Sequence, residues 1–162
     1  MNVFAWIAFI GLSIKVGGIV ISYIISLRNE EAAKDLYQGM NLIAYKEDSL
    51  AHYTIIVIYR LLQFSMQAYI AYLVISLLSN LNIQRPFNAS VLKIMQRICY
   101  CLLLLWVIIV GHNFHVGILE ANTGISANLL PSEFVYIAGI IYIFSLLFKR
   151  GLELQSENEL TI

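Results

Sequence analysis

Four long apolar stretches divide the chain, at residues 3–27, 51–78, 91–110 and 133–148. The first three are long enough to cross a hydrocarbon layer about 30 Å thick, which takes about 20 helical residues, and the fourth reaches that length if its helix continues into the tail. The stretches are continuously apolar and do not alternate, which favours helices over the strands of a membrane barrel. The pattern predicts an all-α, integral membrane bundle of four transmembrane helices. We expect the fourth and shortest stretch to continue as helix beyond Arg150, into a C-terminal tail of residues 149–162.

Composition points to the same environment. The chain has 162 residues, of which 60% are hydrophobic and 12% are charged. Soluble domains carry about twice that share of charged residues, and a soluble fold of this length could not bury so much apolar surface. The net charge is +0, which gives no reason to expect direct binding to nucleic acid. We therefore expect membrane lipids to surround most of the chain.

Basic residues between the helices predict the orientation. Residues 79–97 contain three basic residues and no acid, and Lys149 and Arg150 follow the last apolar stretch. Residues 111–132 contain no Lys or Arg, whereas residues 28–50 mix three basic residues with five acids. Cytoplasmic connections are enriched in Lys and Arg, and acids count for little in this rule. We therefore expect both termini and the 79–97 connection in the cytoplasm.

Polar residues inside the apolar stretches are the first candidate site. Lys15 lies near the middle of the first stretch, and Arg60, Gln63 and Gln67 form a stripe at helical spacing in the second. A charge at this depth costs at least a few kcal/mol unless it faces protein or water. One interpretation is a polar cavity that binds an anion or an anionic head group. The other is structural, with hydrogen bonds between helices and Arg60 reaching the outer interface.

Histidines give a weaker metal hypothesis. His112 and His115 are three residues apart in what we expect to be a glycine-rich loop, with Glu120 nearby. Imidazole and carboxylate groups bind zinc, and histidines also sense pH, but this spacing alone is common by chance. We expect no metal and no cofactor. The sequence also lacks nucleophile-elbow, zinc-protease and phosphate-loop motifs, so we expect no enzyme.

The tail is the second candidate site. Lys149 and Arg150 anchor the helix at anionic head groups, and Gly151 lowers helix propensity beyond them. The acidic, leucine-bearing tail could bind a basic partner, fold back on the basic connection, or simply end the helix in water. The candidate contact residues are Arg85, Lys93, Arg97, Glu153, Glu157, Leu160 and Ile162.

Two blocks carry a family resemblance: RPFNASVLKIMQRI at residues 85–98 and the closing stretch of residues 130–162. Together they resemble the bacterial membrane proteins of domain of unknown function 2975. The departures are mild, with Glu159 in place of aspartate and a final isoleucine in place of valine. The matching residues are Pro86, Phe87, Asn88, Phe148, Arg150, Gly151, Glu153, Leu154, Gln155, Glu157, Leu160, Thr161 and Ile162.

The resemblance implies a small four-helix protein of the bacterial cytoplasmic membrane with no assigned activity. Members of this family are often encoded beside a small helix-turn-helix regulator. We therefore expect a non-enzymatic regulatory or signalling protein whose cytoplasmic face binds such a regulator. The alternative is a protein that binds or transports a small molecule, ion or lipid, and homo-oligomer formation stays open.

Overall fold

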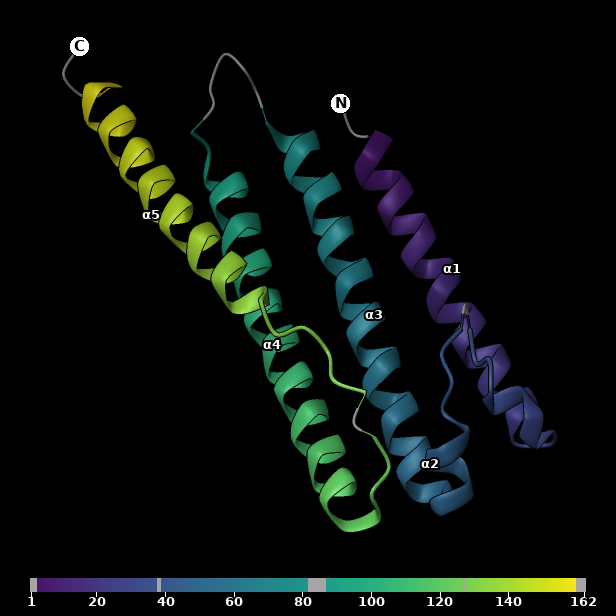
Figure 1. The fold of residues 1–162 in the computed structure, drawn as a ribbon. Coiled ribbons are helices and arrows are strands. Elements are labelled where there is room, and N and C mark those ends of the chain that lie inside the picture. The colour runs from purple at the N-terminus through teal and green to yellow at the C-terminus, as the bar shows by residue number, and fades with distance from the viewer. Residues whose placement is uncertain (1–2, 38, 82–86, 127, 160–162) are drawn as a thin grey trace.

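The computed structural model describes residues 3–37, 39–81, 87–126 and 128–159, and within these ranges every element is helical (Figure 1). The long helices are α1 (Val3–Ser26), α3 (Leu50–Asn80), α4 (Ala89–Thr123) and α5 (Phe134–Glu159). Two short elements, η1 (Glu30–Ala33) and α2 (Ile43–Asp48), lie between α1 and α3. The prediction of an all-α chain is confirmed.

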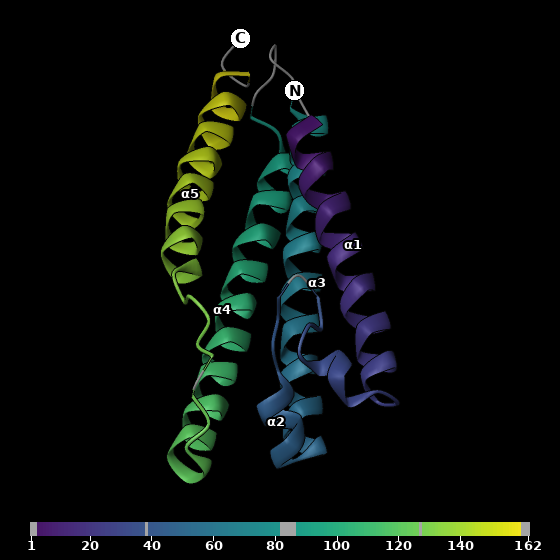
Figure 2. The ribbon, with the colours of Figure 1, turned by 45° about the vertical axis from the view of Figure 1, so that its right-hand side comes forward.

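The long helices pack in the order α1, α3, α4, α5, so that α1 and α5 form the two edges of an open bundle (Figures 1 and 2). The start of α1, the end of α3, the start of α4 and the end of α5 lie together at what we call the proximal end. The short elements and the end of α4 lie at the opposite, distal end. Successive long helices are therefore antiparallel.

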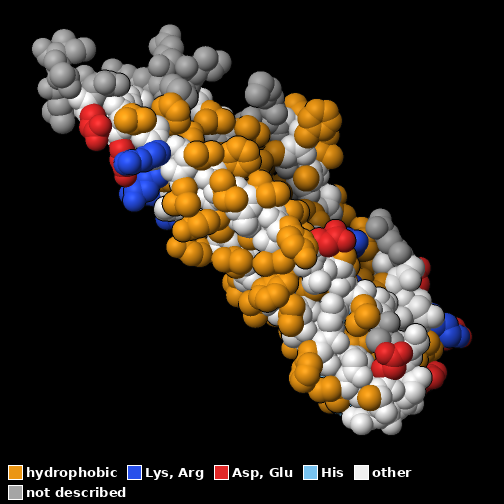
Figure 3. Space-filling view, turned by 60° about the vertical axis from the view of Figure 1, so that its left-hand side comes forward, with side chains coloured by type: hydrophobic (Ala, Val, Ile, Leu, Met, Phe, Trp, Pro, Cys, Tyr) orange, Lys and Arg blue, Asp and Glu red, His pale blue; other side chains and the backbone are white. Residues whose placement is uncertain are grey.

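The outer helices expose apolar side chains that a soluble protein would bury. Phe4 is 86% exposed on α1, and Tyr136 is 74% exposed on α5. Hydrophobic side chains form a broad band across the middle of the face shown in Figure 3, with most of the charged side chains toward its two ends. All four long helices are long and apolar enough to cross a membrane. This surface is stable in lipid, where apolar side chains need no burial.

Local capping explains where α4 begins and ends. The Asn88 side chain accepts hydrogen bonds from the backbone of Ser90 (2.7 Å) and Val91 (3.2 Å), so Asn88 is the N-cap of α4. Gly124 ends the helix with φ 73°, in the left-handed region that glycine enters without steric cost. Its N–H group bonds the carbonyl of Glu120.

Helix α4 is longer than the sequence suggested. We expected a glycine-rich loop after residue 110, but the helix continues to Thr123. A glycine within a helix costs only about 1 kcal/mol relative to alanine. Burial of Val116 and Leu119 on the face that packs toward α3 offsets that cost. The loop prediction is therefore wrong, whereas the predicted continuation of α5 past Arg150 is confirmed.

The first connection is folded and not a simple loop. Its apolar side chains Leu36, Leu42 and Tyr45 are buried in one cluster with Tyr53 of α3. The backbone N–H of Leu42 bonds the carbonyl of Ala33 at 2.9 Å, which closes the connection on itself. Burial of these side chains attaches η1 and α2 to the distal ends of α1 and α3.

Candidate functional site

A layer of buried polar side chains lies between α3 and α4. Arg60 is 6% exposed, Gln63 is 5% exposed and His112 is fully buried. The Tyr59 ring lies edge-on to the His112 ring, with centroids 5.8 Å apart, and 6.3 Å from the His115 ring. We call this set the polar layer; it comprises His52, Tyr59, Arg60, Gln63, His112 and His115.

Several atoms of the polar layer have no hydrogen-bond partner within the described ranges of the chain. They are Nε of Arg60, Oε1 of Gln63, Nδ1 of His52, and Nε2 of both His112 and His115. Most buried polar atoms in proteins are paired, because an unpaired one costs about 1–3 kcal/mol. These unpaired atoms give the layer free hydrogen-bonding capacity for further polar groups, water included.

Arg60 connects this layer to the surface. Its Nη2 donates a 3.0 Å hydrogen bond to the side-chain oxygen of Asn128, which is exposed. The Tyr45 hydroxyl donates to the carbonyl of Ser126 and accepts from the N–H of Asn128, at 3.0 and 3.3 Å. Tyr45, Ser126 and Asn128 also line a groove of about 600 Å³ between α2 and the segment after Gly124. We call it the distal groove.

The polar layer lies at the distal boundary of the membrane-spanning region. Arg60 is about 20 residues from Asn80 at the proximal end of α3, or about 30 Å along the helix. That distance is about the thickness of the hydrocarbon layer. Helix α5 begins near this level of the bundle, since Phe134 at its start packs on Leu105 and Ile109 of α4. Arg60 thus lies close to the interface, where its charge is tolerated better than at the membrane centre.

The four residues of the predicted cavity have different surroundings. Arg60 and Gln63 are buried in the polar layer, and Gln67 is half-buried one turn further along α3. The Lys15 ammonium lies over the Phe64 ring, 4.1 Å from its centroid. That contact is a cation–π interaction between α1 and α3. The structure thus groups Arg60 and Gln63 with the histidines, and gives Lys15 an aromatic partner.

The histidines are helical and do not belong to a loop. His112 and His115 lie on α4, and His115 contacts the His52 ring of α3 with centroids 5.5 Å apart. Glu120 is exposed near the end of α4. Among the described residues, no group of three or more His, Cys, Asp or Glu side chains is arranged to hold a metal ion. Sequence reasoning missed His52 because it is far from the other two along the chain.

The predicted partner-binding residues lie at the proximal end, as far as the structure describes them. Lys93 and Arg97 are exposed near the start of α4, and Glu157 is exposed on α5. Glu153 accepts a 2.8 Å hydrogen bond from Arg150 and lies 4.0 Å from Lys149. Arg85, Leu160 and Ile162 are outside the described residues.

The tail helix is held against α4 by aromatic contacts. The rings of Phe87 and Phe148 lie 5.0 Å apart, and the Phe87 ring also lies against Gly151. A β-carbon at position 151 would be 2.4 Å from the Phe87 ring. Gly151 therefore permits close packing, and α5 continues through it to Glu159.

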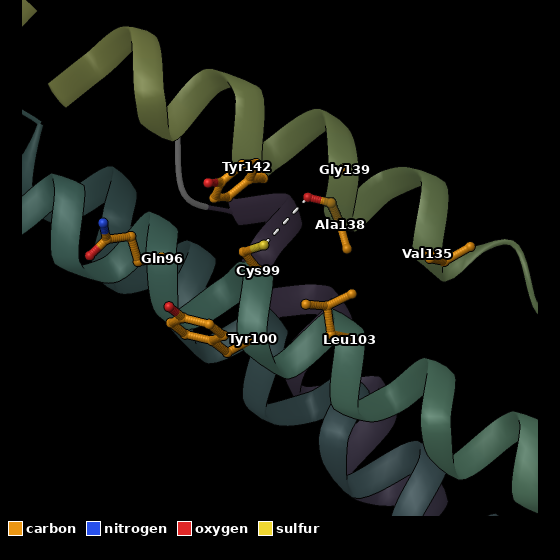
Figure 4. Close-up of a pocket in the computed structure, with 8 residues that line it drawn as sticks. All are labelled: Gln96, Cys99, Tyr100, Leu103, Val135, Ala138, Gly139 and Tyr142. Atoms are coloured by element: carbon orange, nitrogen blue, oxygen red, sulfur yellow. Dashed lines mark hydrogen bonds between the residues drawn. The ribbon is translucent and has the colours of Figure 1, made fainter. Parts of the chain in front are cut away.

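A second groove, of about 380 Å³, lies between α4 and α5 (Figure 4). Ala138 and Gly139 of α5 are small, and the Cys99 thiol of α4 donates a 3.4 Å hydrogen bond to the Ala138 carbonyl across the gap. Tyr100 and Tyr142 line the same groove. Its walls are mostly apolar, which suits a lipid chain better than a polar ligand. Cys99 and Cys101 are both free thiols.

Four membrane-crossing helices with an apolar outer surface define a multi-pass helical membrane protein. Within that class, the chain belongs to the family described as protein of unknown function (DUF2975), whose model matches residues 28–162. The match covers both blocks that carried the resemblance, and it confirms the family. No curated protein and no solved structure matches the chain.

Proposed function

We propose that this protein is a non-enzymatic regulatory membrane protein that binds a protein partner at its proximal end. The observation that carries the proposal is the packing of Phe87 against Phe148 and Gly151. This contact supports α5 where it continues beyond its apolar stretch as a charged helix. An ordered helix binds a partner at a lower entropic cost than a flexible tail does.

The charges at this end suit a partner with surfaces of both signs. Lys93 and Arg97 are exposed on α4, while Glu153 and Glu157 extend along α5. A small helix-turn-helix regulator, the neighbour that the family resemblance suggested, has a basic DNA-binding face that could contact the acidic side. In this proposal the membrane is the bacterial cytoplasmic membrane and the proximal end faces the cytoplasm, where a DNA-binding protein can reach it.

A pull-down with the full-length protein in detergent tests this proposal. The bait is the tagged protein, and the probe is the helix-turn-helix protein encoded beside its gene. We expect capture by the wild type and at least tenfold weaker capture by the double variant Glu153→Gln and Glu157→Gln. The matched control is Glu31→Gln at the distal end, which also removes one exposed carboxylate. Equal capture by all three proteins, or none by the wild type, would contradict the proposal.

The second candidate function is binding of a small anion. It is favoured by the burial of Arg60, which forms no ion pair with any acid that the structure describes. The two functions involve opposite ends of the molecule, so each can be tested without the other.

A further inference from the structure

We propose that Arg60 binds a phosphate-type oxyanion at the distal membrane boundary, and that the anion reaches it through the distal groove. This inference rests on the second candidate function and makes it specific. It is independent of the protein partner proposed for the proximal end.

The first argument is charge. A guanidinium group stays protonated at any accessible pH, and that of Arg60 is removed from water almost completely. Buried charges in proteins are normally paired with an opposite charge. Here the described hydrogen-bond partner of the guanidinium is a neutral amide, that of Asn128. A bound anion would supply the missing negative charge.

The second argument is hydrogen-bonding capacity. The Nε–H group of Arg60 is an unpaired donor, and Oε1 of Gln63 is an unpaired acceptor. Nδ1 of His112 lies 3.2 Å from the side-chain oxygen of Asn113, so in the neutral imidazole it carries the proton and leaves Nε2 as an acceptor. The layer therefore offers a charged donor beside two acceptors. Its complement is an anion that also carries a hydroxyl group, as hydrogen phosphate and phosphate monoesters do.

The third argument is access. Asn128 is exposed, lines the distal groove and accepts a hydrogen bond from Arg60, so its side chain links the groove to the guanidinium. The Tyr45 hydroxyl holds the backbone at Ser126 and Asn128, which fixes this wall of the groove. An Asn128 side chain that rotates toward solvent would leave Nη2 free for the anion. The groove lies near the membrane boundary, so both a free phosphate and the monoester head group of a lipid can approach.

The most informative variant for testing this proposal is Asn128→Asp, which replaces the side-chain amide by a carboxylate of nearly the same size. It places a carboxylate within hydrogen-bond distance of Arg60 and so supplies an internal counter-charge. We expect this variant to fold, to unfold at a higher temperature than the wild type, and to lose its response to phosphate. Because the variant gains stability, loss of the response cannot be attributed to misfolding.

The experiment measures the melting temperature of full-length protein in two arms. In the first, detergent-purified protein is titrated with inorganic phosphate against chloride at equal ionic strength. In the second, the protein is placed in phosphatidylcholine nanodiscs with or without phosphatidic acid. A bound ligand stabilises the folded protein in proportion to the logarithm of its concentration above Kd. We expect at least a tenfold weaker response in Asn128→Asp than in the wild type.

The control variant is Lys15→Gln, which removes the half-buried cation of α1 and leaves the distal groove intact. It should respond as the wild type does. A response to phosphate in the first arm supports a free anion, and a response only to phosphatidic acid supports a lipid head group. The proposal is overturned if neither arm gives a response, or if Asn128→Asp keeps the full response. None of these outcomes depends on whether a regulator binds the proximal end.

Discussion

The ring of Phe87 lies against the backbone of Gly151, so close that a β-carbon there would be 2.4 Å from Cε1 of the ring. Gly151→Ala should therefore push the Phe87 ring away from Phe148 and separate the tail helix from α4. We expect a loss of about 1–2 kcal/mol in the free energy of unfolding, which is within the range for overpacking. Unfolding in mixed micelles measures it.

Gly139, on the same helix, provides the matched control for this prediction. A β-carbon at position 139 would have no atom within 4 Å. Gly139→Ala should therefore be neutral or stabilise the helix by up to about 1 kcal/mol. In a Phe87→Ala background, Gly151→Ala should cost nothing. Equal effects of the two glycine substitutions in the wild-type background would show that the Phe87 contact is unimportant.

Gly18 gives the second prediction, because it lets Tyr37 of the first connection pack on α1. A β-carbon at position 18 would be 2.5 Å from Cε2 of Tyr37, whereas one at the neighbouring Gly17 would have no atom within 4 Å. Gly18→Ala should loosen the connection, and Gly17→Ala should not. Limited proteolysis of residues 28–50 distinguishes them, with cleavage at least several-fold faster in Gly18→Ala. Similar cleavage rates in the two variants would contradict this role.

Much of the fold could be predicted because the chain contains four long, continuously apolar stretches, a pattern typical of membrane-spanning helices. The sequence also indicated the Asn88 cap, since an asparagine before an apolar helix has a specific hydrogen-bonding role. It did not indicate the end of α4. Gly111 and Gly117 look like loop residues in isolation, and only packing against α3 explains why the helix continues through them. Tertiary contacts, which local sequence does not contain, carry the helix past these two glycines, and Gly124 then ends it.

The candidate site could be predicted only in part, for the same reason. Arg60 and Gln63 were recognisable because their spacing places polar groups on one face of an apolar helix. The role of Asn128 was not recognisable, since an asparagine in a connection is ordinary. Its contact with Arg60 joins positions 68 residues apart. Gly151 was interpreted through its own propensity, and its actual role depends on Phe87, a residue of the segment that precedes α4.

The third prediction concerns Asn113, whose side chain binds the backbone of Leu130. Its side chain accepts a hydrogen bond from the Leu130 N–H and donates one to the Leu130 carbonyl, both at 2.8 Å. Asn113→Ala would leave both backbone groups of a buried residue unpaired, at a cost of about 2–3 kcal/mol. Asn113→Asp keeps the acceptor and loses the donor, so its cost should be intermediate. Thermal unfolding in detergent measures both.

Asn122 is the control for that prediction, because it is exposed near the end of α4. Asn122→Ala should change the melting temperature by little. Hydrogen exchange of residues 124–133 provides a local measurement, and it should become faster in Asn113→Ala alone. Unchanged exchange in that variant would mean that the segment is held by other contacts, and the assigned role of Asn113 would be wrong.

The fourth prediction concerns Lys15, whose cation–π contact with Phe64 stabilises the protein while its charge within the membrane destabilises it. The ammonium lies 4.1 Å from the ring centroid, a contact that contributes about 0.5–2 kcal/mol. Lys15 is also near the middle of α1, and its ammonium lies at the level of Phe64, one helical turn deeper in the membrane than Arg60. A charged side chain costs up to about 2.5–3.5 kcal/mol at the membrane centre. The cost exceeds the gain, so Lys15→Met should stabilise the protein by about 1 kcal/mol.

The paired variant Phe64→Leu separates the two effects. With Lys15 present it removes the aromatic partner and leaves the cation at membrane depth, so it should destabilise the protein. With Met at position 15, the same substitution should cost only the lost packing, because no cation depends on the ring. Unfolding in mixed micelles, with both singles and the double variant, gives the coupling energy. If Lys15→Met instead destabilises the protein, the Lys15 ammonium has a stronger partner than the Phe64 ring. The conclusion that Lys15 lies outside the polar layer of Arg60 would then be wrong.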